Sequence, residues 1–188
     1  AIADSDVRNA LRAEKFYGSG KKYKNLIYVN IGTGLSYSQY RDNEIYLGNK
    51  GYAIHFASSK LIMFDPTSNK KISLIPEKFY SGKSITKYLA KLNNDINHKN
   101  TYNNKQIEYL NNISESLGSL IANLINSIDP QAVILGGGVV IKNKIIKKTI
   151  LINIRKYIYA KDCKKIPIKF SKLNDDAGLI GASALFKL

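Results

Sequence analysis

The stretch GSLIANLINSIDPQAVILGGGV, residues 118–139, decides the fold class of this chain. Apolar residues at helical spacing predict one long helix over residues 105–128, and Asp129-Pro130 ends it. The apolar run that follows predicts a buried strand, which closes on Gly136-Gly137-Gly138. A long helix that leads into a buried strand is typical of an α/β layer.

The segments on either side continue this alternation of helices and strands. Upstream, we expect a helix over residues 4–18 and then a three-stranded meander over 25–47. Irregular structure is expected over 48–80, with a turn at 65–71. A short helix over 84–92 and a polar, Asn-rich loop over 93–105 are expected to follow. Downstream, we expect a basic amphipathic helix near 144–159, a strand over 166–170 and a closing helix from Asp175. The absence of a repeat or linker predicts a single domain.

The composition is that of a globular domain with a strong positive charge. The 188 residues are 44% hydrophobic and 23% charged, and no apolar run reaches the roughly 20 residues that cross a bilayer. The single cysteine, Cys163, excludes an internal disulfide and a multi-cysteine zinc cluster, and suits a reducing, cytoplasmic setting. The net charge of +15 is spread over every segment, which favours a solvated basic surface over a dedicated nucleic-acid patch.

Two glycine turns close apolar strands: Gly32-Thr33-Gly34 and Gly136-Gly137-Gly138. Glycine lets the backbone approach a ligand and point N–H groups at phosphate oxygens, although glycine also ends strands for turn reasons alone. Both interpretations stay open for each turn, and the occurrence of two such turns favours phosphate binding. The segment SGKS, residues 81–84, is not a Walker A loop, because Glu77 occupies the position of the earlier glycine.

Carboxylates near helix starts and two histidines are the other candidates for chemistry. The carboxylates are those of Asp4, Asp6, Asp175 and Asp176, and helix capping is the alternative for each. His55 and His98 have no partner at metal-ligand spacing, so we expect no metal site.

Five segments, in order along the chain, resemble the C-terminal lobe of the ROK family (repressors, open reading frames and sugar kinases) within the actin/hexokinase-type ATPases. They are SDVRNALRAE (5–14), NLIYVNIGTGLSYS (25–38), FYSGKSI (79–85), GSLIANLINSIDPQAVILGGGV (118–139) and DDAGLIGASAL (175–185). The last two segments are the most specific. The resemblance implies a ribonuclease-H-like, actin-type ATPase lobe of the α/β class, with a mixed sheet and helices on its faces.

The resemblance also implies roles in the ATP-dependent phosphorylation of a sugar. Asp6 is expected to be the general base that takes the proton from a sugar hydroxyl. Thr33 and the backbone N–H groups of Gly32 and Gly34 are expected to hold phosphate oxygens. Further nucleotide contacts are expected from Ser81, Gly82, Gly136, Gly137 and Gly138, and Mg²⁺ is expected to arrive with the ATP.

The segments that bind sugar in the family's kinases are altered in this chain. Ser5 stands where the family usually has the Asn that contacts the sugar. GYAIH (51–55) keeps the Gly and His of the family's Gly-Glu-x-Gly-His motif but has Tyr52 in place of the Glu. We therefore expect Ser5, Tyr52 and His55 to border a pocket for a divergent sugar or polyol, where Tyr52 stacks on the ring or packs against protein. Residues 64–80 replace the Cys-rich zinc loop, so no structural zinc is expected.

Three functional hypotheses follow from the resemblance. The first is an ATP-dependent sugar kinase-like lobe, and the second is the sugar-sensing and dimerisation lobe of a ROK transcriptional regulator that does not catalyse. A third is an ancestral fold kept as an assembly partner. The resemblance implies an N-terminal lobe with the first phosphate hairpin outside these residues, a homodimer, and nucleic-acid contact only through a separate helix-turn-helix domain.

Overall fold

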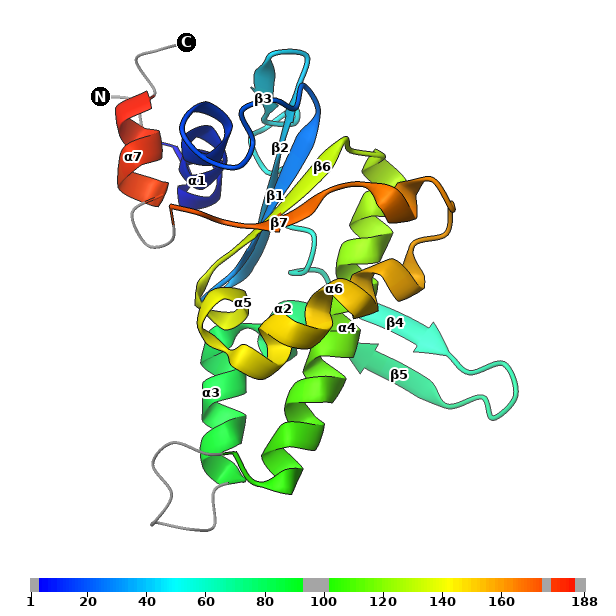
Figure 1. Ribbon diagram of the computed structural model, residues 1–188. Coiled ribbons are helices and arrows are strands. Elements are labelled where there is room, and N and C mark those ends of the chain that lie inside the picture. The colour runs from blue at the N-terminus through cyan, green and yellow to red at the C-terminus, as the bar shows by residue number, and fades with distance from the viewer. Residues whose placement is uncertain (1–3, 93–101, 174–176, 185–188) are drawn as a thin grey trace.

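A five-stranded mixed sheet organises the molecule (Figure 1). The computed structural model describes residues 4–92, 102–173 and 177–184. The strand order is β3-β2-β1-β6-β7, with β1 antiparallel to β2 and parallel to β6. The strands are β1 (Leu26–Ile31), β2 (Leu35–Arg41), β3 (Glu44–Tyr46), β6 (Ala132–Gly136) and β7 (Ile168–Phe170). The predicted α/β class with a mixed sheet and the predicted meander are confirmed.

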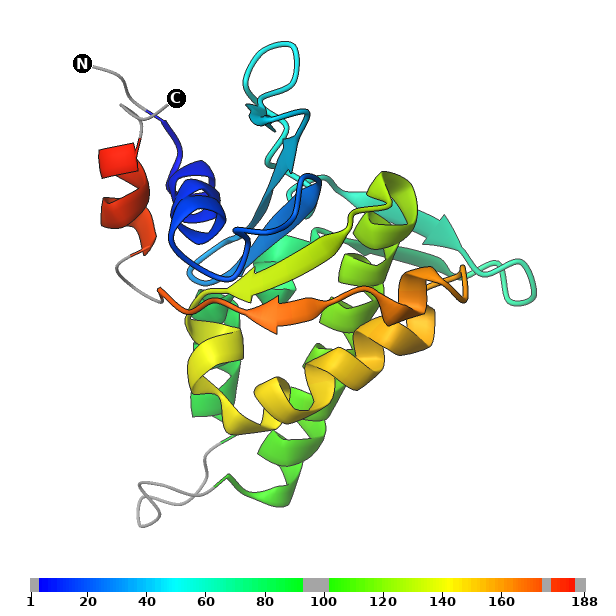
Figure 2. The same ribbon diagram turned by 45° about the horizontal axis from the view of Figure 1, so that its top comes forward.

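Helices cover both faces of this sheet, as Figure 2 shows. One face carries α1 (Asp6–Phe16) and α7 (Ala177–Ser183), and the other carries α4 (Asn104–Ile128) and α6 (Lys144–Tyr157). Successive side chains of a strand point to opposite faces, and β1 follows this rule. Ile27, Val29 and Ile31 enter the core under α4 and α6, whereas Leu26 and Tyr28 enter the core under α1.

Side-chain caps and a left-handed residue set the ends of the two long helices. Asn103 begins α4 with a capping box, in which its side chain accepts from the Gln106 N–H and the Gln106 side chain accepts from the Asn103 N–H. Asp129 ends α4 in a left-handed conformation with φ of 50°, so the helix stops at the predicted Asp129-Pro130 position. The next long helix, α6, begins at Asn143, whose side chain accepts from the N–H groups of Ile145 and Ile146 at 3.1 and 3.0 Å.

The buried carboxylate of Glu14 holds α1 to the segment that follows β7. Its Oε1 accepts from the Ser171 hydroxyl at 2.7 Å and from the N–H groups of Lys172 and Leu173 at 2.8 and 3.1 Å. Its Oε2 accepts from the Ser19 N–H at 2.7 Å. Glu14 is fully buried, so these four hydrogen bonds replace the water that the charge would otherwise need.

Helices α1 and α7, from opposite ends of the described chain, pack closely on each other (Figure 1). A Cβ atom built on Gly181 would lie 1.7 Å from the carbonyl oxygen of Asn9. Only glycine allows the two backbones to approach this far.

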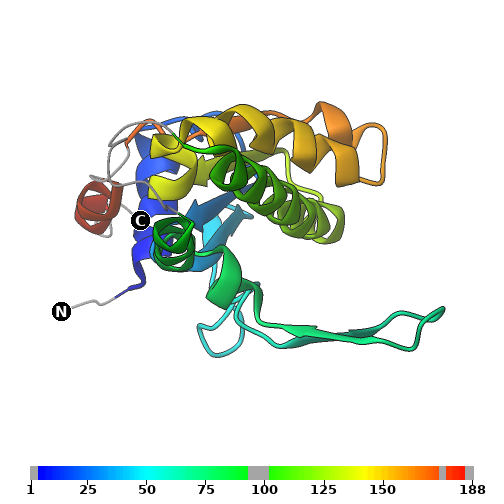
Figure 3. The same ribbon diagram turned by 90° about the horizontal axis from the view of Figure 1, so that it is seen from below.

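Residues 48–80 are more regular than the sequence predicts. They contain a hairpin of β4 (Leu61–Phe64) and β5 (Lys71–Leu74), and the short helix α2 (Pro76–Tyr80) follows it. The predicted turn at 65–71 is present between the two strands, where Asp65 accepts from the Thr67 N–H at 2.9 Å. The strands were missed because neither faces the core: every residue of β4 is exposed, and Figure 3 shows the hairpin projecting from the molecule.

The remaining expectations are met in part. The short helix predicted over 84–92 is α3 (Gly82–Lys91), and a short helix, α5 (Gly138–Lys142), follows the second glycine turn. Residues 93–101, with His98, and the carboxylates of Asp175 and Asp176 lie outside the described residues. Within the described ranges, no helix combines the length and the apolar character needed to cross a membrane.

Candidate functional site

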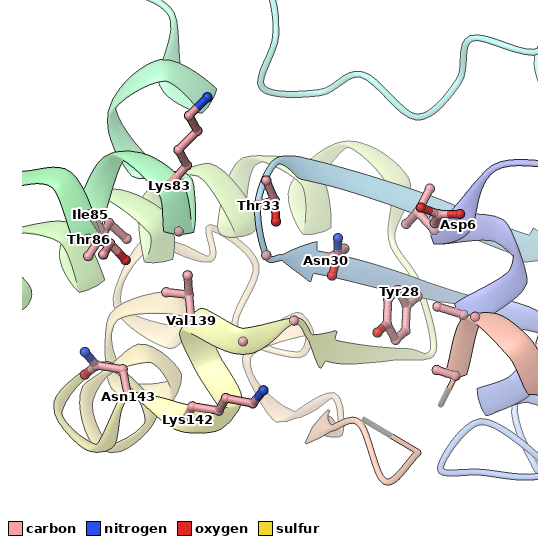
Figure 4. A pocket seen from close by; sticks show the side chains of 18 of the residues that line it. Asp6, Tyr28, Asn30, Thr33, Lys83, Ile85, Thr86, Val139, Lys142 and Asn143 are labelled. Atoms are coloured by element: carbon pink, nitrogen blue, oxygen red, sulfur yellow. The ribbon is translucent and has the colours of Figure 1, made fainter. Parts of the chain in front are cut away.

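A cavity of about 1160 Å³ opens at the carboxyl ends of the parallel strands β1 and β6 (Figure 4). In open α/β sheets, ligands bind at this end of the strands. Both glycine turns, the start of α1, helix α3 and helix α7 contribute to its wall. The lining residues used below are Asp6, Asn9, Tyr28, Asn30, Gly32, Thr33, Gly82, Lys83, Thr86, Tyr102, Gly137, Gly138, Val139, Lys142 and Asn143.

The first glycine turn, between β1 and β2, is fastened to the start of α3. The Gly82 N–H donates to the Gly32 carbonyl at 2.7 Å, so these two predicted residues lie side by side on the cavity wall. Thr33, at the tip of the turn, is exposed and lines the cavity. Gly34 does not line it, and a Cβ atom built there would lie 2.7 Å from Oε1 of Glu77.

The second glycine turn follows β6, and its three residues have two different surroundings. Gly137, with φ of 90°, and Gly138 line the cavity. Gly136 does not, because it packs against Tyr28: a Cβ atom there would lie 1.8 Å from the Tyr28 hydroxyl oxygen. Burial raises the pKa of Tyr28 to about 12, with a hydrogen bond between Tyr28 and Ser171 opposing the rise and the charge of Glu14 adding to it. The phenol therefore stays protonated at neutral pH.

Asp6 lies at the start of α1, is exposed, and lines the same cavity as the two glycine turns. Figure 4 shows it across the cavity from Lys83, with Asn30 between them. The neighbouring carboxylate, Asp4, for which helix capping was one of two open interpretations, does not cap α1 but pairs with two arginines of this helix. Its Oδ1 lies 3.0 Å from Nη1 of Arg8 and its Oδ2 lies 2.6 Å from Nη1 of Arg12.

This Asp4–Arg8–Arg12 ion cluster is buried and joins α1 to the loop before β4. The exposed fractions of the three side chains are 8%, 9% and 7%. Arg8 also donates to the Gly51 carbonyl. Burial by itself raises the pKa of Asp4, but hydrogen bonds from Arg8, the Ser5 N–H and Arg12 outweigh it, and the pKa lies below its ordinary value.

The residues that the resemblance assigned to sugar binding do not line the cavity. Ser5 is the N-cap residue of α1, and its hydroxyl is buried without a hydrogen-bond partner among the described residues. Tyr52 and His55 are exposed, and their ring centroids lie 6.2 Å apart. Ser81 is also outside the lining: it is buried just before α3, with its Oγ 3.2 Å from Oγ of Ser84. The roles predicted for these four residues remain predictions.

Several lining residues escaped the sequence analysis. Lys83, Thr86 and Lys142 lie on helices and line the cavity. The periodicity of a helix does not show which of its residues face a cavity. Tyr102 and Asn143 meet at the end of the cavity away from Asp6, where the Asn143 amide donates to the Tyr102 hydroxyl at 3.2 Å. Tyr28 and Asn30 lie in the strand before the first turn. The one signal available was polar Asn30 within an apolar strand.

No metal centre is evident in the part of the chain that the structure describes. No group of three or more His, Cys, Asp or Glu side chains is placed there to hold a metal ion. The expectation that the chain lacks structural zinc stays a prediction.

The sequence of this chain is similar to those of known repressors and kinases. The chain is 22% identical over 97% of its length to the xylose repressor of Bacillus subtilis strain 168, of which the match covers 49%. It is 23% identical over 99% of its length to the glucokinase of Halalkalibacterium halodurans, of which the match covers 63%. The chain thus spans about half to two thirds of the length of the curated relatives it matches.

Solved structures show the same fold. The crystal structure of a ROK family glucokinase from Streptomyces griseus, in complex with glucose and AMPPNP, matches with a TM-score of 0.78 at 20% identity, over 98% of this chain and 67% of that one. A ROK family transcriptional regulator, a homolog of the Escherichia coli Mlc protein, matches with a TM-score of 0.75 at 17% identity, over 98% of this chain and 51% of that one. The family model described as "ROK family" matches residues 1–188, so this chain belongs to the ROK family.

Proposed function

We propose that residues 1–188 are the C-terminal, nucleotide-binding lobe of an ATP-dependent sugar kinase of the ROK family. The observation that carries the proposal is that Asp6 and both glycine turns line one cavity. Relatives that include glucokinases, and a glucokinase structure of the same fold that holds glucose and AMPPNP, support it.

The cavity has the chemistry that a nucleoside triphosphate needs. Lys83 and Lys142 bring positive charge to its wall, and the backbone near Gly32, Gly82 and Gly137 approaches the interior without side chains. We assign the phosphate chain to the space between the two turns, and the adenosine to the end formed by Val139 and its neighbours. Mg²⁺ would enter with the ATP and neutralise phosphate charge.

Asp6 is proposed to accept the proton of the sugar hydroxyl. As that oxygen forms its bond to the γ-phosphorus, the bond between the γ-phosphorus and the bridging oxygen breaks, and ADP leaves with the bond electrons. Thr33, at the tip of the first turn, would stabilise the phosphate charge. The N–H group of Gly32 donates to the Gly34 carbonyl at 3.1 Å, and Gly34 does not line the cavity, so we do not assign phosphate contacts to these two N–H groups. Asp6 is exposed at its place in the cavity wall, so a substrate hydroxyl can reach its carboxylate.

Replacement of Asp6 by Asn in the complete protein tests this role. The amide keeps the shape but cannot accept a proton, so ATP-dependent phosphorylation of sugars should fall by about 10²–10⁴-fold. Asp162→Asn is the matched control, because Asp162 is 96% exposed at the side chain and does not line the cavity. Unchanged turnover in Asp6→Asn would remove Asp6 from the mechanism.

Because Ser5, Tyr52 and His55 do not line the cavity of this lobe, we propose a divergent sugar or polyol, bound against this face with the help of the rest of the protein. We also propose that the protein is a homodimer. ATP in this fold is gripped between two lobes, so we expect little or no turnover from the 188 residues alone, and ready turnover would contradict the two-lobe arrangement.

A sensor lobe of a transcriptional regulator is the second candidate. The altered sugar segment at Tyr52, which is 71% exposed, and the match to xylose repressors favour it. Calorimetry with sugars in the absence of ATP separates the two functions, because a sensor binds sugar without transferring phosphate. A helix-turn-helix domain in the same protein would also favour the regulator. Saturable nucleotide binding would exclude the third possibility, an assembly partner without a small ligand.

A further inference from the structure

We propose that the side-chain amide of Asn30 binds the phosphate chain of the nucleotide. This inference rests on the proposed function for the identity of the ligand, and it assigns a role to a residue that neither the sequence motifs nor the family resemblance selects. Its basis is the position of Asn30 and the state of its hydrogen-bonding groups.

Asn30 lies between the two glycine turns. In the parallel pair of β1 and β6 it stands opposite Gly136, at the carboxyl ends of both strands. It shares a face of β1 with Tyr28, and both residues line the cavity, but Tyr28 is buried whereas Asn30 is only half-buried. A Cβ atom built on Gly137 would lie 2.7 Å from its Oδ1, and one built on Gly32 would lie 3.4 Å from its Nδ2.

The other asparagines of the cavity wall already have protein partners. Asn9 accepts from Nη1 of Arg12 at 2.9 Å. Asn143 uses its Oδ1 to cap α6 and its Nδ2 to donate to Tyr102. Within the ranges that the structure describes, neither Oδ1 nor Nδ2 of Asn30 makes a hydrogen bond to the protein. A half-buried amide that the fold leaves unpaired is available to a ligand without breaking a protein hydrogen bond.

The side-chain amide of Asn30 suits the phosphate chain of a nucleotide. An amide has no charge of its own, so it does not repel phosphate, and its Nδ2 offers two donors to phosphate oxygens while Oδ1 can accept from a water of the Mg²⁺ shell. Figure 4 shows Asn30 between Thr33 of the first turn and Tyr28, which places the amide between the tip of the phosphate turn and Asp6. The phosphate chain must cross this space for the γ-phosphate to reach Asp6.

The test compares ADP with adenosine on the complete protein, because the proposed nucleotide site lies between two lobes. Titrations by NMR, with nucleotide up to the millimolar range, measure both dissociation constants for the wild type, Asn30→Ala and Asn30→Asp. A hydrogen bond to a charged group contributes about ten- to a hundredfold in affinity, so Asn30→Ala should weaken ADP binding by roughly tenfold and leave adenosine binding unchanged. Asn30→Asp should weaken ADP binding further, because it adds a negative charge. The Asn30 side-chain amide resonance should shift with ADP and stay in place with adenosine.

Asn112→Asp provides the matched control, because Asn112 is exposed on α4 and does not line the cavity. It makes the same chemical change and should leave both dissociation constants unaltered. Equal ADP affinity in the wild type and both Asn30 variants would overturn the role of Asn30 and leave the nucleotide site intact. Equal losses for ADP and adenosine would also overturn it, because they indicate a damaged site. Binding of neither ligand by the wild type would overturn the proposed function itself.

Discussion

At the scale of single residues, two buried carboxylates, Glu14 in α1 and Asp4 just before it, make different kinds of contact. Glu14 accepts four hydrogen bonds and makes them to segments far apart in the chain, whereas Asp4 pairs with two arginines of its own helix. Both are acidic residues in or next to one predicted helix, yet neither caps it through the helix N–H groups.

Glu14→Gln should lower the free energy of unfolding by about 1–3 kcal/mol. The amide presents a donor where the carboxylate accepted hydrogen bonds, so at least one N–H or hydroxyl of the Ser171–Leu173 segment or Ser19 loses its partner. Denaturant unfolding measures the loss. Glu108→Gln, at an exposed position of α4, is the control and should change stability by less than about 0.5 kcal/mol. An equally small effect at Glu14 would contradict the role given to this carboxylate.

Asp4 predicts a pH dependence of stability. Its pKa in the folded protein lies below the ordinary value of 3.8, so the unfolded chain takes up this proton first. The stability that Asp4 contributes is therefore complete above pH 3.8 and is lost as the pH falls through the lowered, folded-state pKa. Asp4→Asn should cost about 3 kcal/mol at neutral pH, because Arg8 and Arg12 lose their buried partner.

Unfolding of the wild type and Asp4→Asn, compared from pH 7 down to pH 2, measures this dependence. The difference between the two proteins should shrink only at the acid end of the range. A difference that stays constant throughout would show that the Asp4 charge does not act through its ion pairs.

The sequence analysis selected many of the residues that line the cavity, but it missed others between and beside them. Five residues that the glycine-rich segments marked in the sequence line the cavity, and their contacts with nucleotide stay predictions: Gly32, Thr33, Gly82, Gly137 and Gly138. Asn30 was missed because it reads as one polar residue within a buried strand. Whether its side-chain amide makes a hydrogen bond to the protein depends on the residues beside it in the sheet. Its neighbour there, Gly136 of β6, comes more than a hundred residues later in the sequence.

At the scale of elements, the strands and helices of the core could be predicted and the exposed hairpin could not. The core elements carry apolar residues at their characteristic periods because one side of each is buried. Strands β4 and β5 have no buried face, so no alternation of polar and apolar residues marks them. Only their turn, with Asp65-Pro66, was visible in the sequence.

The packing of α7 on α1 predicts a sharp contrast between two glycines. Gly181→Ala should lower the free energy of unfolding by about 1–3 kcal/mol, because its Cβ atom would lie 1.7 Å from the Asn9 carbonyl oxygen and must push the helices apart. Gly178→Ala makes the same change in the same helix, but a Cβ atom there meets nothing within 4 Å. It should be neutral or up to about 1 kcal/mol stabilising. Thermal and denaturant unfolding measure both, and equal effects would refute the close helix contact.

At the scale of the whole molecule, the net charge of +15 should act on any anionic ligand of the cavity. If a nucleotide binds as proposed, its affinity should fall several-fold between low and moderate salt, because counterions screen the field of the protein. The dissociation constants of ATP and of adenosine, each measured against salt concentration, check this. Adenosine carries no charge and should show no such fall. A salt-independent affinity for ATP would mean that local contacts, rather than the overall charge, hold the nucleotide.

The pairing of α1 with α7 has a consequence for the order in which the molecule is built. Of the described elements, a ribosome makes α1 first and α7 last, so α1 must wait for all the elements between them before this neighbour exists. The opposite layer, in which α4 and α6 cover β1 and β6, is complete in sequence at Tyr157, before α7 begins at Ala177. We expect this layer to form first during synthesis, with the face that carries Asp6 closing last, because contacts distant in sequence form slowly. The proposed catalytic face would then be the last part of the lobe to mature.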